Sequence, residues 1–266
     1  MCIITSINLN NNKYLAKNRD RAYKPTIGII HTIIKNTEIV FLYDYDTNWC
    51  EGMNEYGIAV VNSALSVGYD EIEKKIIKKT GKKSKDGKQI IKALILNNIG
   101  DVCNSLMKYE NGVRGHTFIN DKDNSYAIES TAKHNPILKH ITDEVNFIVR
   151  TNHGFLYPDA GYQHGKDYKS SKIRKISAEN VLGNIDNKNE ILPNLRKKFY
   201  SYQSNLNMNR DNKLSTTTQL MMDSNNKIFT LHVLKNDIKE FKGIINKLPE
   251  NMEIAQIRLV LILPIP

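Results

Sequence analysis

Residues 1–20 read MCIITSINLNNNKYLAKNRD, and this stretch contains the first predicted pair of strands. Two segments that contain apolar residues, 2–7 and 13–18, flank the polar run NLNNN. Short apolar segments on either side of a polar turn indicate a β-hairpin. The sequence therefore predicts a first strand that begins at Cys2.

Cys2 has a second property, which depends on its place in the sequence. A penultimate cysteine is small enough for the initiator methionine to be removed, and the mature chain then begins with Cys2. Such a residue carries a free α-amine, whose ordinary pKa of about 7.7–8.0 leaves it partly unprotonated near neutral pH. An N-terminal thiol with this amine has its own general base, as N-terminal nucleophiles of other types do. Met-Cys alone is a weak signal, because a small residue in an edge strand explains it as well.

The rest of the chain alternates short strands with a few helices. Further hairpins are predicted at 27–34 with 38–43, at 117–120 with 126–129, and at 216–222 with 227–233. Single strands are predicted at 58–62, 146–151 and 253–263. Helices are predicted at 87–98, at 170–182, at 192–202, at 237–247, and from Asp101, whose carboxylate is expected to cap the helix. Strands outnumber helices, which indicates an α+β fold of antiparallel sheets covered by helices, in one domain over residues 2–266.

Composition excludes several classes of protein. The 266 residues are 40% hydrophobic and 25% charged, close to globular averages, so disorder of the whole chain is excluded. No run of 18 apolar residues occurs, which excludes a membrane-spanning helix. The N-terminus lacks the features of a signal peptide, and the three cysteines form no CxxC pair. Since no His pair has zinc-ligand spacing either, the sequence predicts a metal-free, cytoplasmic protein.

The net charge of +10 is concentrated in one segment. Nine lysines and three acidic residues between positions 71 and 92 supply +6 of it. A basic patch of this kind can bind nucleic acid or an anionic surface. No aromatic residue lies among these lysines to stack on bases, so we interpret the segment as a solvated loop and expect no nucleic-acid partner.

Short motifs follow one another in a fixed order along the chain. After Met-Cys come AKNRD at 16–20, EGMNEYGIA at 51–59, GHTFINDKDNSYAIEST at 115–131, RTNHG at 150–154 and SSKIR at 170–174. In this order and spacing they resemble the N-terminal-nucleophile (Ntn) cysteine hydrolases. That superfamily includes choloylglycine hydrolases, penicillin V acylases, acid-ceramidase-like amidases and the isopenicillin N acyltransferase-like group. The motif at 51–59 is the most specific, since it resembles the Asp-Gly-Met-Asn-Glu-x-Gly-Leu-Ala segment of the family.

The resemblance implies a four-layer αββα sandwich and hydrolysis of a linear carbon–nitrogen amide bond in a small N-acyl compound. Cys2 would be the nucleophile and would form a thioester, with its own α-amine carrying the proton. Asp20 would hold that α-amine, Asn152 would donate a hydrogen bond to the oxyanion, and Arg174 would lower the pKa of the thiol. The resemblance also implies no metal, no organic cofactor and a maturation that removes only Met1.

The sequence departs from the family pattern near these residues. Lys17 stands where the family has arginine, which keeps the charge and loses the bidentate fork. Arg19 is an additional cation, and the sequence leaves open which of the two faces the site. The second oxyanion asparagine of bile-salt hydrolases would fall at Ala64, so Asn62, on the same strand face, is the candidate for that role.

Two alternatives to a hydrolase remain open at this point. An acyltransferase would pass the acyl group from the thioester to an amine instead of water. Proteins with an NRDE motif, which are implicated in trafficking, begin Met-Cys-Ile and carry Asn-Arg-Asp-Glu. Residues 18–20 fit that motif, while Arg21 replaces its glutamate. The sequence names neither the substrate nor whether the chain forms a homo-oligomer.

Overall fold

The computed structural model describes residues 2–65, 86–108, 113–131, 134–157, 169–197, 205–206, 209–210, 214–247 and 258–262. Most of the basic segment at 71–92 lies outside these residues, so its interpretation as a solvated loop stays a prediction. Among the described helices, none combines the length and the apolar character that a membrane span requires.

The first sheet is built around the predicted N-terminal hairpin. Its strands lie in the order β10 (Phe147–Arg150), β1 (Cys2–Leu9), β2 (Asn12–Arg21), β12 (Leu214–Asp223), β13 (Ile228–Val233) and β15 (Arg258–Ile262), with β11 (Asn209–Arg210) paired to β12. Asn10 and Asn11 form the turn between β1 and β2 with φ of 52° and 60°. Asparagine tolerates this left-handed conformation, and two-residue hairpin turns require it, so the NLNNN run is confirmed as the turn.

The second sheet contains the middle of the chain. Its strands lie in the order β14 (Glu240–Lys247), β3 (Thr26–Ile34), β4 (Thr37–Asp44), β5 (Trp49–Asn54), β6 (Ala59–Ser63), β7 (Gly115–Asn120), β8 (Ser125–Ser130) and β9 (Ile137–Ile141). All neighbours in this sheet are antiparallel except β14, which runs parallel to β3. The predicted α+β class is confirmed.

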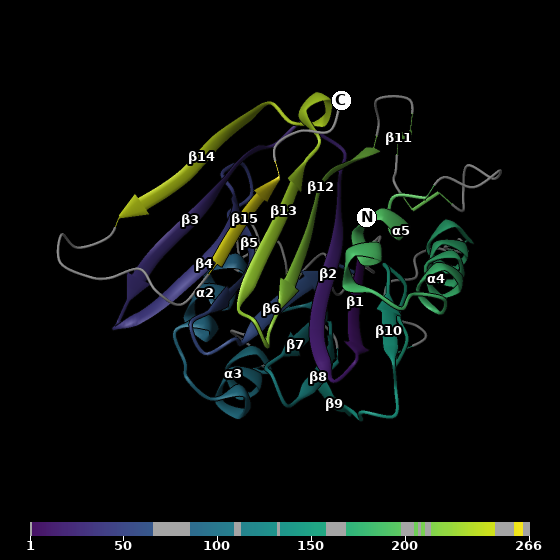
Figure 1. The fold of residues 1–266 in the computed structure, drawn as a ribbon, viewed down its shortest axis with the longest axis horizontal. Coiled ribbons are helices and arrows are strands. Elements are labelled where there is room, and N and C mark those ends of the chain that lie inside the picture. The colour runs from purple at the N-terminus through teal and green to yellow at the C-terminus, as the bar shows by residue number, and fades with distance from the viewer. Residues whose placement is uncertain are drawn as a thin grey trace.

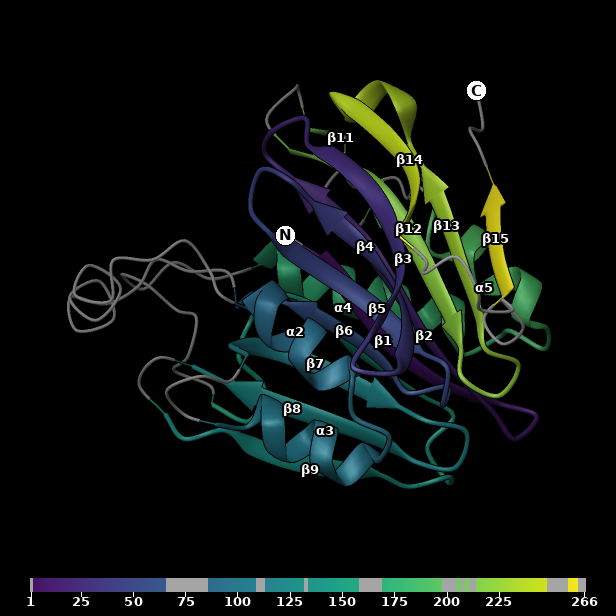
Figure 2. The ribbon, with the colours of Figure 1, turned by 90° about the vertical axis from the view of Figure 1, so that its left-hand side faces the viewer.

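Three apolar clusters place the sheets and helices in four layers (Figures 1 and 2). Ile4 and Leu15 of the first sheet meet Val40 and Leu42 of the second in the cluster between the sheets. The outer face of the second sheet packs on α2 (Asp86–Leu94) and α3 (Ile99–Leu106). The outer face of the first packs on α4 (Lys169–Leu182) and α5 (Ile191–Asn194), which follows a 3₁₀ turn at Lys188–Glu190. The αββα order expected from the resemblance is therefore confirmed.

Two of the predicted helices are wrong in extent or type. The helix predicted over 192–202 ends at Asn194 and is followed by a turn at 195–196, while 198–202 lie outside the described residues. The helix predicted over 237–247 is a 3₁₀ turn at Lys235–Asp237 followed by strand β14. Gly243 in β14 has φ of +75°, and the register shifts nearby, so this segment cannot continue as a helix.

The start of α3 also differs from the prediction. Asn98, not Asp101, is the N-cap: its side chain accepts hydrogen bonds from the backbone N–H groups of Gly100 and Asp101. Asp101 lies in the first turn, where a carboxylate is still favourable beside the helix dipole.

Candidate active site

Cys2 begins strand β1, in the interior of the first sheet between β10 and β2. It lies directly opposite Arg19 of β2, and Ile4 lies opposite Lys17. Residues directly opposite each other share one face of a sheet, and Ile4 packs between the sheets. The Cys2 side chain therefore points toward the second sheet, where it is 5% exposed.

Asn152 holds the backbone of Cys2. Its Oδ1 accepts a hydrogen bond from Cys2 N at 2.8 Å. Its Nδ2 donates to the Ala64 carbonyl at 2.6 Å and to Ser63 Oγ at 3.0 Å. The Ala64 carbonyl can only accept, so the orientation of the Asn152 amide is fixed. Asn152 Nδ2 can donate to an oxyanion in this position by exchanging one of these two bonds, of which the bond to Ser63 is the longer.

Helix α4 fixes the segment that carries Asn152. Ser171 Oγ accepts from Asn152 N at 2.8 Å and bonds the Thr151 hydroxyl at 2.8 Å. Thr151 in turn donates to the Ser171 carbonyl at 3.0 Å. One turn of helix therefore determines where the Asn152 side chain lies relative to Cys2.

Asp20 and Arg174 lie together on the other face of the first sheet. Arg174 Nη2 of α4 donates to Asp20 Oδ2 at 2.6 Å, and Thr216 Oγ1 donates to Asp20 Oδ1 at 2.7 Å. Both Asp20 and Arg174 are fully buried, and within the described residues neither bonds the nitrogen or the sulfur of Cys2. The structure thus brings this pair together but places Asn152 and Arg21, not Asp20 and Arg174, against Cys2.

Three cations of β2 share the face of the Cys2 side chain. Lys17, Arg19 and Arg21 alternate along the strand and therefore point the same way. Lys17 pairs with Glu51, and Arg19 pairs with Asp44 at 2.9 Å. The sequence left open whether Lys17 or Arg19 faces inward; both do.

Arg21 is the cation that touches the thiol. Its Nη1 lies 3.7 Å from Cys2 Sγ, and its Nε lies 3.5 Å from Asp44 Oδ2. Tyr23 donates to the same Asp44 oxygen at 2.8 Å. Arg21 was not predicted as a site residue, because the predicted strand stopped at residue 18, whereas β2 continues to Arg21.

The surroundings separate the three cysteines. Burial opposes ionisation of Cys2, but the charges of Lys17, of the N-terminal ammonium and of Arg21, in that order, outweigh burial and the nearby Asp20, so the pKa of the Cys2 thiol is lowered. Burial, reinforced by Glu51, raises the pKa of Cys50 far above its ordinary value. Burial also raises the pKa of Cys103, to about 12. Cys2 is thus the one cysteine in a setting that favours the reactive thiolate.

Asn62 does not face the candidate site with its side chain. Its Nδ2 donates to the Arg114 carbonyl at 3.0 Å and to Thr117 Oγ1 at 2.8 Å. Only its backbone carbonyl contributes, by accepting from Lys17 Nζ at 2.5 Å. Ser63, the next residue along β6, contacts Asn152 instead.

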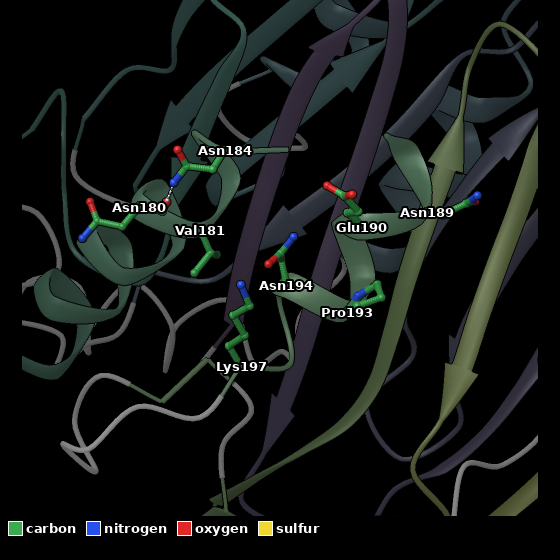
Figure 3. Close-up of a pocket in the computed structure, with 8 residues that line it drawn as sticks. All are labelled: Asn180, Val181, Asn184, Asn189, Glu190, Pro193, Asn194 and Lys197. Carbon is green, nitrogen blue, oxygen red and sulfur yellow. Dashed lines mark hydrogen bonds between the residues drawn. The ribbon is translucent and has the colours of Figure 1, made fainter. Parts of the chain in front are cut away.

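No cofactor site is apparent in the described part of the chain. Groups of three His, Cys, Asp or Glu side chains able to hold a metal are absent from it. A separate concavity of about 540 Å³ lies between α4 and α5, lined by amides with Glu190 and Lys197 (Figure 3). Its lining includes none of the predicted site residues.

Comparison with known proteins places this arrangement in a fold class. No protein-family model matches the sequence, and no curated protein matches it. A Caenorhabditis elegans orthologue of N-acylethanolamine-hydrolyzing acid amidase matches the fold with a TM-score of 0.59 and 13% identity, over 83% of this chain and 92% of that chain. Penicillin V acylase from Agrobacterium tumefaciens matches with a TM-score of 0.53 and 13% identity, over 98% of this chain and 100% of that chain. The chain therefore has the Ntn-hydrolase fold, as the sequence motifs indicated.

Proposed function

We propose that this chain is an Ntn amidase that hydrolyses a linear carbon–nitrogen amide bond in a small N-acyl compound. Cys2, freed from Met1, is the nucleophile. The observation that carries the proposal is that both reactive groups of Cys2 have partners: Asn152 holds the nitrogen at 2.8 Å, and Arg21 lies 3.7 Å from the sulfur. The two amide-hydrolysing proteins that share the fold support the same reaction class.

The proposed reaction proceeds through a thioester. The thiol proton passes to the α-amine, and the thiolate attacks the amide carbonyl carbon. The carbon–nitrogen bond then breaks as the ammonium returns its proton to the leaving amine. Water attacks the thioester, gives a proton to the α-amine and releases the carboxylic acid with the thiolate. No step requires a metal or an organic cofactor.

The remaining site residues position these groups. Asn152 Oδ1 orients the α-amine, and its Nδ2 donates to the developing oxyanion once that oxygen replaces the Ser63 hydroxyl. A preorganised donor of this kind contributes about 3–4 kcal/mol in comparable sites. Asp20, bound by Arg174, fixes the end of β2 from the helix-facing side of the sheet.

Turnover of an N-acyl amide panel by cysteine variants tests the proposal. Cys2→Ala is expected to lose activity by at least about a thousandfold, as removal of a covalent nucleophile does elsewhere. Cys50→Ala and Cys103→Ala remove the other two thiols and are expected to retain activity, because both lie in the apolar cluster under α2 and α3. A Cys2→Ala variant as fast as the native chain would refute the proposal.

The fate of the acyl group is tested in the same assay. Hydrolysis predicts free acid as the sole acyl product even with a competing amine present. Acyl-amine product would assign the chain to the acyltransferases instead. A thiol that reacts with no amide or ester in the panel would favour the NRDE-type alternative.

A further inference from the structure

The buried side chains around Cys2 carry more positive than negative charges, if the charge of a Cys2 thiolate is not counted. Lys17 and Arg19 are 1% and 0% exposed, and the Arg21 side chain is 14% exposed. Asp44 and Glu51 of the second sheet are both 0% exposed. Three cations thus face two carboxylates, and no other described acidic residue forms an ion pair with them.

The two carboxylates are already shared among the cations. Glu51 takes Lys17 and lies 3.7 Å from Arg19 Nε, while Asp44 takes Arg19 at 2.9 Å and Arg21 at 3.5 Å. A second N–H of Lys17 donates to the Asn62 carbonyl. Arg21 therefore has the most distant carboxylate of the three, and one positive charge is left without a matching anion. An unmatched charge is costly in a buried place.

The sulfur of Cys2 occupies the place of the missing anion. Cys2 is 5% exposed, and its Sγ lies 3.7 Å from Arg21 Nη1 on the face of the sheet that carries the three cations. As a thiolate it gives three anions to three cations. Asp20, the other nearby carboxylate, points to the opposite face and is taken up by Arg174.

We propose that Arg21 is a catalytic residue that holds Cys2 as a resident thiolate in the resting protein. The inference rests on the proposed role of Cys2 as nucleophile. The resemblance to the family had implied that Arg174 lowers the pKa of the thiol, and the inference gives that function to Arg21. The thiol proton resides on the α-amine before substrate arrives, so sulfur attacks without a prior deprotonation, and the ammonium then gives that proton to the leaving amine.

Arg21 then acts twice in the reaction. During attack the carbon–sulfur bond forms and the negative charge moves from sulfur to the carbonyl oxygen. During hydrolysis of the thioester the carbon–sulfur bond breaks, and sulfur leaves as a thiolate beside the guanidinium. A sulfur with a lower pKa leaves faster, so the ion pair favours the second step in particular.

The pH dependence of Cys2 alkylation tests this directly and needs no turnover. The full-length purified protein is treated with iodoacetamide over a range of pH, and modification is measured on the Cys2 peptide alone. Arg21→Gln removes the positive charge, and Arg21→Lys keeps it without the guanidinium. Lys13→Gln is the matched control, because Lys13 lies on the same face of β2, about 26 Å along the strand from Arg21, and pairs with Asp143.

The native chain is expected to react with a thiol pKa below the ordinary value, and Arg21→Gln to react with a pKa at least one unit higher. At a pH below the native pKa, each unit by which the thiol pKa rises lowers the alkylation rate about tenfold. Arg21→Lys should lie between the two, and Lys13→Gln should match the native chain. Arg21→Gln should also slow thioester hydrolysis more than thioester formation.

Three results would overturn the inference. One is an Arg21→Gln profile that coincides with the native profile. Another is an unchanged thiol pKa with a raised KM only for amides that carry a carboxylate, which would show that the spare charge binds substrate. If Arg21→Gln fails to fold, the thiolate absorbance of the native chain is compared with that of Cys2→Ser at a pH below the ordinary cysteine pKa. Equal absorbance of the two proteins at that pH would refute the ion pair. A low, Arg21-dependent pKa without any acyl adduct would contradict the proposed function alone.

Discussion

Glu51 connects the most specific sequence motif to the candidate site. It is the first residue of EGMNEYGIA, is fully buried, and pairs with Lys17 close to Arg19. Burial alone would raise the pKa of its carboxyl, but Lys17 and then Arg19 outweigh it and lower the pKa. Glu51 is therefore ionised at neutral pH, and it holds two of the three cations that surround Cys2.

Removing the charge of Glu51 should destabilise the protein strongly. Glu51→Gln leaves Lys17 without a buried counter-charge, and breaking a buried pair in this way costs about 3–5 kcal/mol. The free energy of unfolding in urea measures the effect. Asp143→Asn breaks the ion pair of Lys13 on the same strand, where the lysine side chain is 5% exposed but the carboxylate is 74% exposed, and should lower the urea midpoint much less. Equal changes in the free energy of unfolding for the two variants would show that the Glu51–Lys17 pair does not stabilise the site.

At this scale the sequence predicted part of the site. Cys2 and Asn152 do lie together, whereas Asp20 and Arg174, which were predicted to contact the amine and the thiol of Cys2, bind each other. Arg21 was not predicted as a partner of the thiol. The signal was present, because basic residues at 17, 19 and 21 share one strand face, but it becomes visible only if the strand is known to reach Arg21.

At the scale of elements, most of the motif at 51–59 serves the β5–β6 turn. A side chain at Gly52 would meet the Val40 carbonyl at 2.3 Å, and Gly57 adopts φ of +79°. The Asn54 side chain accepts from Tyr56 N and Ile58 N and donates to two carbonyls at the end of α2. A motif can thus be specific for a fold while only its first residue lies near the chemistry.

Helix α3 offers a test of the observed N-cap. Asn98→Ala removes the side chain that accepts from Gly100 N and Asp101 N and should cost about 1 kcal/mol of unfolding free energy. Asn104→Ala, at an exposed position within the same helix, should cost nothing, since alanine favours a helix interior. Thermal unfolding of both variants measures the difference. Equal midpoints would contradict the assignment of Asn98 as the cap.

The segment after Asn152 depends on one carboxylate of strand β8. Glu129 accepts from the backbone N–H groups of Phe155, Leu156 and Tyr157 at 2.9, 2.8 and 3.1 Å. Three such bonds hold the chain just beyond the candidate oxyanion donor. Residue 129 therefore has a positioning role that its place in the AIEST motif did not reveal.

Glu129→Gln should loosen this segment and slow catalysis. Glutamine keeps only one acceptor oxygen, so bonds to the second oxygen are lost and those that remain become neutral. Each such bond to a charged group contributes about 1.5–3 kcal/mol. Amide exchange of residues 155–157 should accelerate, and kcat should fall about tenfold with little change in KM. Unchanged exchange at these amides would contradict the role of Glu129, whatever happens to activity.

At the scale of the whole molecule, the sequence predicted the layers better than the peripheral elements. Alternating apolar residues and Asn-rich turns predicted the hairpins, because both signals are local. Strand β14 was predicted as a helix, since its partner β3 lies about 200 residues earlier and such pairing leaves no local pattern. The helix predicted over 192–202 ends early where the Leu195 carbonyl accepts from Asn18 of the sheet, a contact between distant parts of the chain.

The contact between the α5 segment and the first sheet makes stability depend on pH. Arg196 Nη2 lies 2.6 Å from His232 Nδ1, and burial, followed by the charge of Arg196, lowers the pKa of His232 from 6.5 to about 4. Between these values the unfolded chain binds a proton that the folded chain does not. The free energy of unfolding should therefore fall as pH decreases from 6.5 to 4, by at most about 1.4 kcal/mol per unit from this group.

His232→Asn tests that dependence. The Asn Oδ1 can take the place of Nδ1 as an acceptor for Arg196, but it does not titrate. Urea midpoints of the variant should fall less steeply than those of the native chain between pH 6.5 and 4. His140→Asn, at an exposed histidine of β9, is the control and should leave the slope unchanged. Parallel curves for the native chain and His232→Asn would contradict the predicted proton uptake.

The central claim is that Cys2, as the first residue of the mature chain, forms the acyl-enzyme. Intact-mass analysis of the purified protein after brief exposure to a slowly hydrolysed acyl ester tests it most directly. We expect a chain without Met1 that carries one acyl group, which maps to Cys2 and is absent from Cys2→Ala. A chain that turns over amides while it retains Met1, or that carries the acyl group at another residue, would contradict the assignment of Cys2 as the nucleophile.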